Sequence, residues 1–179
     1  DRLKASVFGQ LHREMRNWSV LQFRRSYVAK GHGGQKRAFK IKFIGEGVND
    51  YGGPYRAVFE QIVDELQNDS IAAVGRKPSD RCLLPFFIPS ANKFASLGSN
   101  QDKFVMSSAA GNAPIFQEMM QFFGRLVGTA TRHNMNLALN LSSLVWRPLV
   151  RLGLTRKDLD SVDSLSATLL TTIAEQGLA

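Results

Sequence analysis

A glycine-rich turn between two segments of different periodicity is the feature that most constrains the fold of this 179-residue chain. Before the turn, apolar and basic residues alternate in FKIKF at 39–43, which is typical of a strand with one buried face. After the turn, GEGVNDYGG, a segment opens with Pro54, a residue suited to the first turn of a helix. The apolar residues of this segment form a broad helical stripe: Val58, Phe59, Ile62, Val63 and Leu66. The sequence therefore predicts a strand, a turn and a helix in direct succession.

Three further segments have helical periodicity. The first predicts an apolar face made of Leu3, Val7, Leu11 and Met15. The strongest, 113–134, is again opened by a proline, and a last helix over 163–177 is predicted to direct inward Leu165, Leu169, Leu170 and Ile173. Thr155 and Asp158 have the spacing of a helix cap.

Two short extended segments, 83–89 and 103–107, are separated by a polar loop and predict a hairpin. The chain is long enough to bury a hydrophobic core. Its apolar stretches are short and interrupted by charges, so none approaches the roughly 20 apolar residues of a membrane span. The predicted fold class is α+β, mainly helical, with a few short antiparallel strands.

Gly124 and Gly128 lie four residues apart, on one face of the 113–134 helix. Each glycine costs about 1 kcal/mol of helix stability relative to alanine. We therefore expect a compensation at this face, in the form of a second backbone that approaches closely. Glu118, Arg125 and Arg132 argue against the membrane setting in which such spacing indicates helix dimerisation.

The net charge of +8 is concentrated near the amino terminus, where residues 1–42 hold eleven Lys and Arg against two acids. A candidate basic surface follows from the cations in this segment: Arg24, Arg25, Lys30, Lys36 and Arg37. Such a surface suits an acidic partner or nucleic acid. The alternatives are a solvated basic loop, or a helix surface that covers an acidic patch elsewhere in the parent protein. Nucleic acid is the less favoured partner because no recognised binding motif accompanies the charges.

Residues with catalytic potential are few. Glu46 and Asp50 lie in the glycine-rich turn and could form a carboxylate pair, but turn hydrogen bonding or helix capping explains them better. Cys82 is the chain's one thiol, with no histidine near it in sequence, and we do not predict it to be catalytic. The three histidines are widely spaced, so no metal site is predicted, and no nucleotide-binding motif suggests a cofactor.

Two long segments, in the right order, carry a resemblance to a known family. FKIKFIGEGVNDYGGPYRAVFEQIVDEL resembles the opening signature of HECT-type ubiquitin ligase domains, and FFGRLVGTATRHNMNLALNLSSLVWRPLVRLGLTRKDLDSVD resembles the next landmark of that family. The likeness extends over residues 21–175 and is greatest to the HERC-like and other very large HECT ligases. Asn49 stands where many relatives have an acid, and the loop at 67–82 and the basic segment 24–42 match poorly.

The resemblance implies a bilobal ubiquitin transferase, whose carboxy-terminal lobe carries a cysteine that accepts ubiquitin as a thioester. We expect residues 1–179 to be part of the amino-terminal lobe, ending before the subdomain that docks the conjugating enzyme. On that expectation the chain is inactive alone. Its partners would be a ubiquitin-conjugating enzyme, ubiquitin, protein substrates and the catalytic lobe of the same protein. The expected location is the cytoplasm, with the nucleus as a second compartment.

The resemblance also suggests structural roles for the turn residues, which we expect to hold the lobe's internal geometry: Gly45, Glu46, Gly47, Asp50, Gly52 and Gly53. If Gly53 has a positive φ, Gly53→Val should unfold the chain, because a β-branched side chain clashes there.

Overall fold

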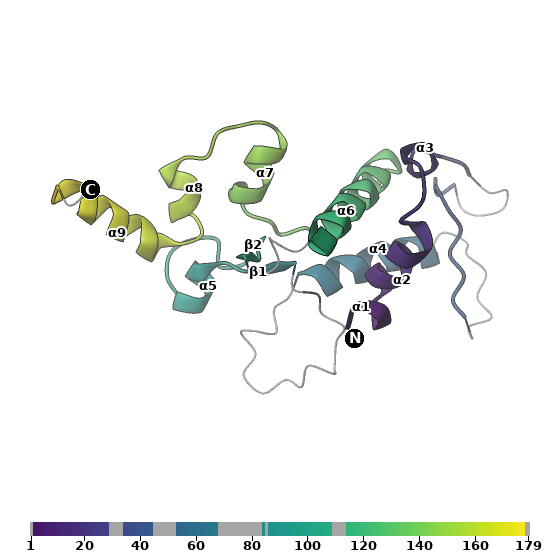
Figure 1. Cartoon of the computed structure of the whole chain (residues 1–179), viewed down its shortest axis with the longest axis horizontal. Coiled ribbons are helices and arrows are strands. Elements are labelled where there is room, and N and C mark those ends of the chain that lie inside the picture. Colours follow the sequence, from purple (N-terminus) through teal and green to yellow (C-terminus); the bar gives the residue numbers. More distant parts are fainter. Residues whose placement is uncertain are drawn as a thin grey trace. The chain divides into compact units, whose positions relative to one another are not determined.

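A computed structural model describes residues 2–28, 34–44, 53–67, 84, 86–108 and 114–177 (Figure 1). The chain divides into two compact units. The first comprises Asp1–Glu65 and Ala109–Ala138, and the second comprises Leu66–Ser108 and Leu139–Ala179. The predicted class is confirmed: the described chain is mainly helical, with one two-stranded antiparallel sheet.

The first unit is helical. Its elements are α1 (Arg2–Ala5), α2 (Val7–Met15), α3 (Val20–Phe23), α4 (Gly53–Leu66, whose last residue belongs to the second unit) and α6 (Pro114–Arg132). Aromatic rings join these helices: Phe122 of α6 contacts Phe8 of α2 at a centroid distance of 5.5 Å and Phe23 of α3 at 6.1 Å. One part of the unit's core therefore forms where α2 and α3 meet α6.

Helix α4 begins one residue before Pro54, as its sequence predicts, and all five residues of the predicted stripe are buried. Tyr55, one residue after the proline, is also fully buried and packs its ring against Phe39 and Phe59. The periodicity of the segment thus identifies the buried face of α4 correctly.

The predicted amino-terminal helix is divided at Ser6, whose hydroxyl accepts the backbone N–H of Gly9 at 2.9 Å and donates to the carbonyl of Leu3 at 2.7 Å. The predicted apolar face is wrong by about one residue. Of that set only Met15 is buried, and it lies with Phe8 and His12 on the face that contacts α6. A separate cap at Ser6 begins a new helix and so changes which residues share a face.

The strand predicted at 39–43 does not form. Among the described residues the segment pairs with no strand, although Phe39 and Ile41 are buried and Lys40 and Lys42 are exposed. The alternation therefore reports one-sided burial of an extended chain. A strand also needs a hydrogen-bonded neighbour, and alternation does not provide one.

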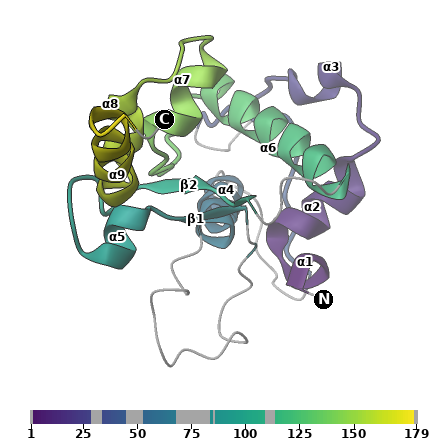
Figure 2. The ribbon, with the colours of Figure 1, turned by 60° about the vertical axis from the view of Figure 1, so that its left-hand side comes forward.

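The second unit contains β1 (Phe87–Pro89), α5 (Ala91–Ala95), β2 (Phe104–Met106), α7 (Ser143–Leu149), α8 (Arg156–Asp160) and α9 (Ser164–Glu175) (Figure 2). The predicted hairpin is confirmed, because β1 and β2 pair antiparallel with Ile88 opposite Val105. The predicted cap is also confirmed: the hydroxyl and the backbone N–H of Thr155 both donate to Asp158 at the start of α8.

Asn92 of α5 ties the start of α9 to the rest of this unit. Its side chain is buried, accepts the backbone N–H of Ser164 at 2.8 Å, and donates to the carbonyls of Ser99 and Asp160. Gly98, with φ of +71°, lies against the same amide, because a Cβ there would come within 2.8 Å of Asn92 Nδ2.

The orientation predicted for the last helix is wrong for three of its leucines. Leu165 and Leu169 are 59% and 60% exposed, Leu170 is 44% exposed, and the buried residue of α9 is Ala167. Helix α9 packs on α8 and α5, and its leucines are not covered by the described residues. Periodicity identifies an apolar face but not the partner that covers it.

Candidate functional site

Most of the predicted turn lies outside the described residues, including Gly45, Glu46, Gly47, Asp50 and Gly52. Its last residue, Gly53, begins α4. Gly53 does not have a positive φ, and a Cβ built on it meets no described atom within 4 Å. The expected steric need for glycine is therefore absent at this position, and the prediction that Gly53→Val unfolds the chain is withdrawn.

The structure describes four of the five cations of the candidate basic surface, and they differ in exposure. Arg24, Arg25 and Lys36 are exposed, whereas Lys30 lies outside the described residues. Arg37 is only 1% exposed, which corrects its assignment to the basic surface. At this position Arg37 and Tyr27 exchange two backbone N–H···O bonds of 3.0 and 3.1 Å that fold the segment back on itself.

A buried polar chain joins the basic segment to α4 and α6. The backbone N–H of Ala38 donates to the hydroxyl of Tyr55 at 3.2 Å. That hydroxyl lies 3.1 Å from Nδ1 of His133, and Nε2 of His133 lies 3.0 Å from the carbonyl of Arg25. Three segments far apart in sequence therefore meet at one histidine, just after α6 ends.

The partners of His133 select one neutral tautomer. A carbonyl can only accept, so Nε2 carries the proton that is donated to Arg25. Nδ1 is then the acceptor for the hydroxyl proton of Tyr55, whose oxygen accepts from Ala38. Burial holds the pKa of His133 below its usual 6.5, and the positive charges of Arg132 and Lys36 lower this pKa further. The hydrogen bond to the carbonyl of Arg25 raises the pKa and only partly offsets these effects. His133 is thus a neutral structural link.

Gln35 extends this chain toward the exposed side of α4. Its side-chain oxygen accepts a hydrogen bond from Nε of Arg56 at 2.6 Å. Its amide nitrogen donates to the carbonyl of Lys36 at 2.8 Å. These bonds fix the path of the segment at 35–38 without using the Lys36 ammonium. That side chain remains exposed.

Glu65, near the end of α4, caps α2 from a distant part of the sequence. One carboxylate oxygen accepts the N–H of Val7 at 2.8 Å and the other accepts the N–H of Phe8 at 2.9 Å. These are N–H groups of the first helical turn, which have no partner within the helix, and a negative charge there also complements the helix dipole. Burial raises the pKa of Glu65, and the two backbone bonds partly oppose that rise.

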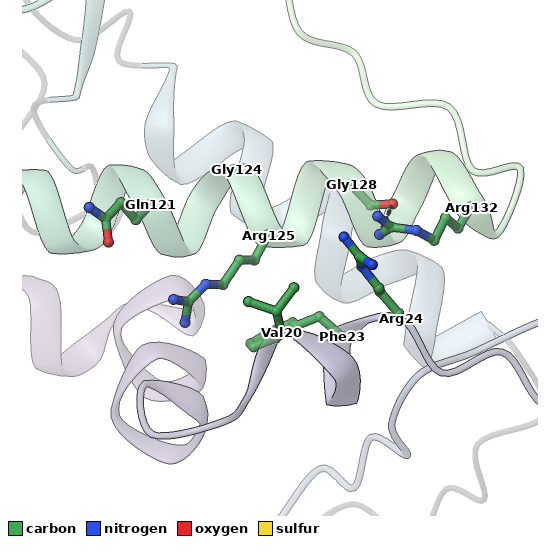
Figure 3. A pocket seen from close by; sticks show the side chains of 8 residues that line it. All are labelled: Val20, Phe23, Arg24, Gln121, Gly124, Arg125, Gly128 and Arg132. Atoms are coloured by element: carbon green, nitrogen blue, oxygen red, sulfur yellow. Dashed lines mark hydrogen bonds between the residues drawn. The ribbon is translucent and has the colours of Figure 1, made fainter.

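An open groove of about 400 Å³ runs between α3 and α6 in the first unit (Figure 3). We call it the α3/α6 groove. It is lined by Val20, Phe23, Arg24, Gln121, Gly124, Arg125, Gly128 and Arg132. Both predicted packing glycines therefore face this groove.

The expected close approach of a second backbone at these glycines is not found. Among the described residues nothing lies within 4 Å of a Cβ built on Gly124, and a Cβ on Gly128 meets only the guanidinium of Arg132. Among the described glycines, one that close packing does require is Gly9 of α2, where a Cβ would collide with the carbonyl of Leu3. Spacing alone could not distinguish a packed glycine from one that opens a groove.

The residues of the polar chain were not predicted as a site. Tyr55 appears in sequence as one more aromatic residue beside a helical stripe, and His133 as an isolated histidine. Tyr55 and His133 are 78 residues apart, and nothing local marks them as partners. Among the described residues no group of three or more His, Cys, Asp or Glu could hold a metal ion. Nor do the described helices include one long and apolar enough to cross a membrane.

Comparison with known proteins establishes the family. The model of the HECT-domain (ubiquitin-transferase) family matches residues 62–177, more than half of the chain. The chain belongs to this family.

The relatives with curated names are large proteins. The chain is 38% identical over 127 residues to human E3 ubiquitin-protein ligase HERC2 and 34% identical over 158 residues to the mouse protein of that name. It is 28% identical over 133 residues to human Probable E3 ubiquitin-protein ligase HECTD4. These alignments cover 71%, 88% and 72% of this chain but only 2–3% of each relative. The predicted resemblance to HERC-like ligases is thus confirmed.

Proposed function

We propose that this chain is a scaffold portion of a HECT-type ubiquitin-protein ligase, within the amino-terminal lobe, and that it is inactive alone. The observation that carries the proposal is the family match over residues 62–177, whose helices and hairpin the structure describes. The described residues supply buried links and caps, which are the features of a scaffold. The active thiol is proposed to lie outside this chain.

The chemistry of the family gives a physical reason for that assignment. Transfer through a thioester requires a thiolate that can reach the thioester carbonyl of a loaded conjugating enzyme. The one cysteine, Cys82, lies outside the described residues and is followed by two leucines, and its sequence neighbours include no histidine that would lower its pKa. We therefore assign Cys82 no catalytic role.

The proposed partners follow from the same assignment. They are a ubiquitin-conjugating enzyme, ubiquitin, protein substrates and a catalytic lobe of the same protein. The proposed location is the cytoplasm, with the nucleus as a second compartment, because a chain with a single cysteine suits a reducing environment.

A ubiquitin-loading assay tests the proposal. The 179-residue chain and its longer natural protein are each incubated with activating enzyme, a panel of conjugating enzymes and labelled ubiquitin. We expect a thiol-sensitive ubiquitin adduct on the longer protein only, and we expect it to persist in the Cys82→Ala variant. An adduct on the 179-residue chain that disappears in Cys82→Ala would refute the scaffold assignment. Absence of loading on the longer protein would refute the ligase assignment.

A further inference from the structure

The α3/α6 groove is strongly one-sided in charge. Its described lining contains the guanidinium groups of Arg24, Arg125 and Arg132 and no carboxylate. Low-dielectric walls on either side of a groove concentrate the field of such charges, which raises the local concentration of anions. The groove is therefore suited to a negatively charged occupant.

Two of these arginines are held in place by the fold. The guanidinium of Arg125 lies over the ring of Phe23, 5.7 Å from its centroid, and Nη1 of Arg132 donates to the carbonyl of Gly128 at 2.9 Å. A guanidinium has five N–H donors, so the bond to Gly128 leaves others for an acidic ligand. Side chains that are already ordered lose less entropy when they bind a partner.

The groove is elongated along α6. From Gln121 to Arg132 the helix rises about 16 Å, which accommodates roughly five residues of extended polypeptide. In Figure 3 Arg24 and Arg132 extend toward Gly128, while Arg125 points toward the opposite end with Val20 between them. Cations spread along a groove match carboxylates spaced along a chain, whereas a single phosphate is small enough to be bound bidentately by one arginine.

The groove also offers apolar contact. Val20 is half exposed at its edge, and the neighbouring Leu21 is 72% exposed. Opposite Val20, the absence of a side chain at Gly124 leaves space that the described residues do not fill. An aliphatic side chain of an occupant could cover this region while flanking carboxylates pair with the arginines.

We propose that the α3/α6 groove is a docking site for an acidic polypeptide segment of a partner protein, with carboxylates on both sides of an aliphatic residue. Charge complementarity carries the proposal, together with the length of the groove and its apolar middle. The proposal does not rest on the thioester chemistry proposed above. It therefore stands even if that assignment fails.

Binding of a defined peptide to the 179-residue chain tests the docking site. The probe is a fluorescent peptide of about 12 residues containing Glu and Leu, chosen to exceed the length of the groove. Its control replaces every Glu by Gln. We expect saturable binding of the Glu peptide, followed by anisotropy, and a decrease in affinity as salt is added. The Gln peptide should bind at least about fivefold more weakly, since two exposed ion pairs are lost.

Matched variants locate the binding. Gly124→Glu adds a carboxylate where space is available, and it should weaken binding at least about fivefold by repelling the peptide. Gly153→Glu makes the same change in the second unit, also at a glycine with open space, and should bind as the wild type does. Removing Arg125 and Arg132 together, both to Gln, should weaken binding similarly, whereas Arg13→Gln, at an exposed arginine of α2, should have little effect.

Thermal melts of each variant establish that it is folded. When the Glu peptide is added to the wild-type chain, the NMR chemical shifts of the backbone amides of Val20, Gly124 and Gly128 should change. Equal affinity of the two peptides, or wild-type affinity in both Gly124→Glu and the double arginine variant, would overturn the proposal. A single-stranded oligonucleotide of equal charge that displaces the peptide at lower concentration would also overturn it, in favour of nucleic acid.

Discussion

The hydroxyl of Tyr55 offers a sharp test of the buried polar chain. Tyr55→Phe removes one oxygen and keeps the ring, which packs 5.1 Å from Phe39 and 5.2 Å from Phe59 by centroid distance. The hydroxyl accepts from the N–H of Ala38 and donates to Nδ1 of His133, and both of those residues are buried. The substitution therefore leaves one donor and one acceptor without these partners, at no cost in ring packing.

The magnitude follows from those two groups. A buried polar group that loses its partner costs about 1–3 kcal/mol, and the bond lengths of 3.1 and 3.2 Å favour the lower end of that range. We expect Tyr55→Phe to reduce the free energy of unfolding by about 2 kcal/mol. For a chain of this size that corresponds to a fall of roughly 4–8 °C in melting temperature.

Urea unfolding followed by circular dichroism at neutral pH measures this change. Tyr27→Phe is the matched control, because it makes the same chemical change at a residue that is 42% exposed in the same basic segment. We expect the control to stay within about 0.5 kcal/mol of the wild type. If Tyr55→Phe also stays within that limit, or if both substitutions cost the same, the hydroxyl does not link the segment to His133.

The lowered pKa of His133 means that the folded chain binds fewer protons than the unfolded chain, so stability present above about pH 6.5 should be lost as the pH falls toward that lowered pKa. His133→Gln should remove this part of the pH dependence of urea unfolding. Glu65→Gln should lower the free energy of unfolding by about 1–2 kcal/mol, because one first-turn N–H of α2 then faces an amide donor. Asn92→Ala should cost about 2–3 kcal/mol in the same assay by breaking the three part-buried hydrogen bonds of a buried side chain. Gly98→Ala should cost about 1–2 kcal/mol because φ is +71°, whereas Gly124→Ala should raise the melting temperature by adding up to about 1 kcal/mol of helix stability.

Each of these outcomes has a clear contrary. A wild-type pH profile for His133→Gln would remove the protonation argument, and an unchanged midpoint for Glu65→Gln would show that α2 needs no distant cap. Wild-type stability of Asn92→Ala would show that the hydrogen bonds of Asn92 do not hold the start of α9. A destabilising Gly124→Ala would mean that the groove is filled at that position.

Much of the local structure follows from the sequence. The stripe of α4, the hairpin of β1 and β2, and the cap at Thr155 all agree with the pattern that predicts them. Each depends on contacts between residues a few positions apart, or on a short turn between paired segments. Such contacts depend on the fixed periodicity of helices and strands and on short spacings between residues, and both can be read from the sequence.

The candidate sites were less predictable. The glycine pair of α6 was correctly placed on one face, but the expected packing partner is absent among the described residues and an open groove takes its place. Arg24 and Arg37 are both arginines of the same basic segment, and the sequence does not distinguish them. In the structure Arg24 lines the groove, whereas Arg37 is buried. Charge is a property of the residue, whereas exposure depends on which segments cover it.

The sequence by itself determined the buried face of α4, the hairpin, the cap at Thr155 and the two landmarks of the HECT family. Only the tertiary structure decided that Tyr55 meets His133, that Glu65 caps α2, and that Leu169 is left uncovered. The physical reason is the range of the interactions. Helices and turns are stabilised by neighbours along the chain, but a buried hydrogen bond between residues 78 positions apart exists only after the chain has folded.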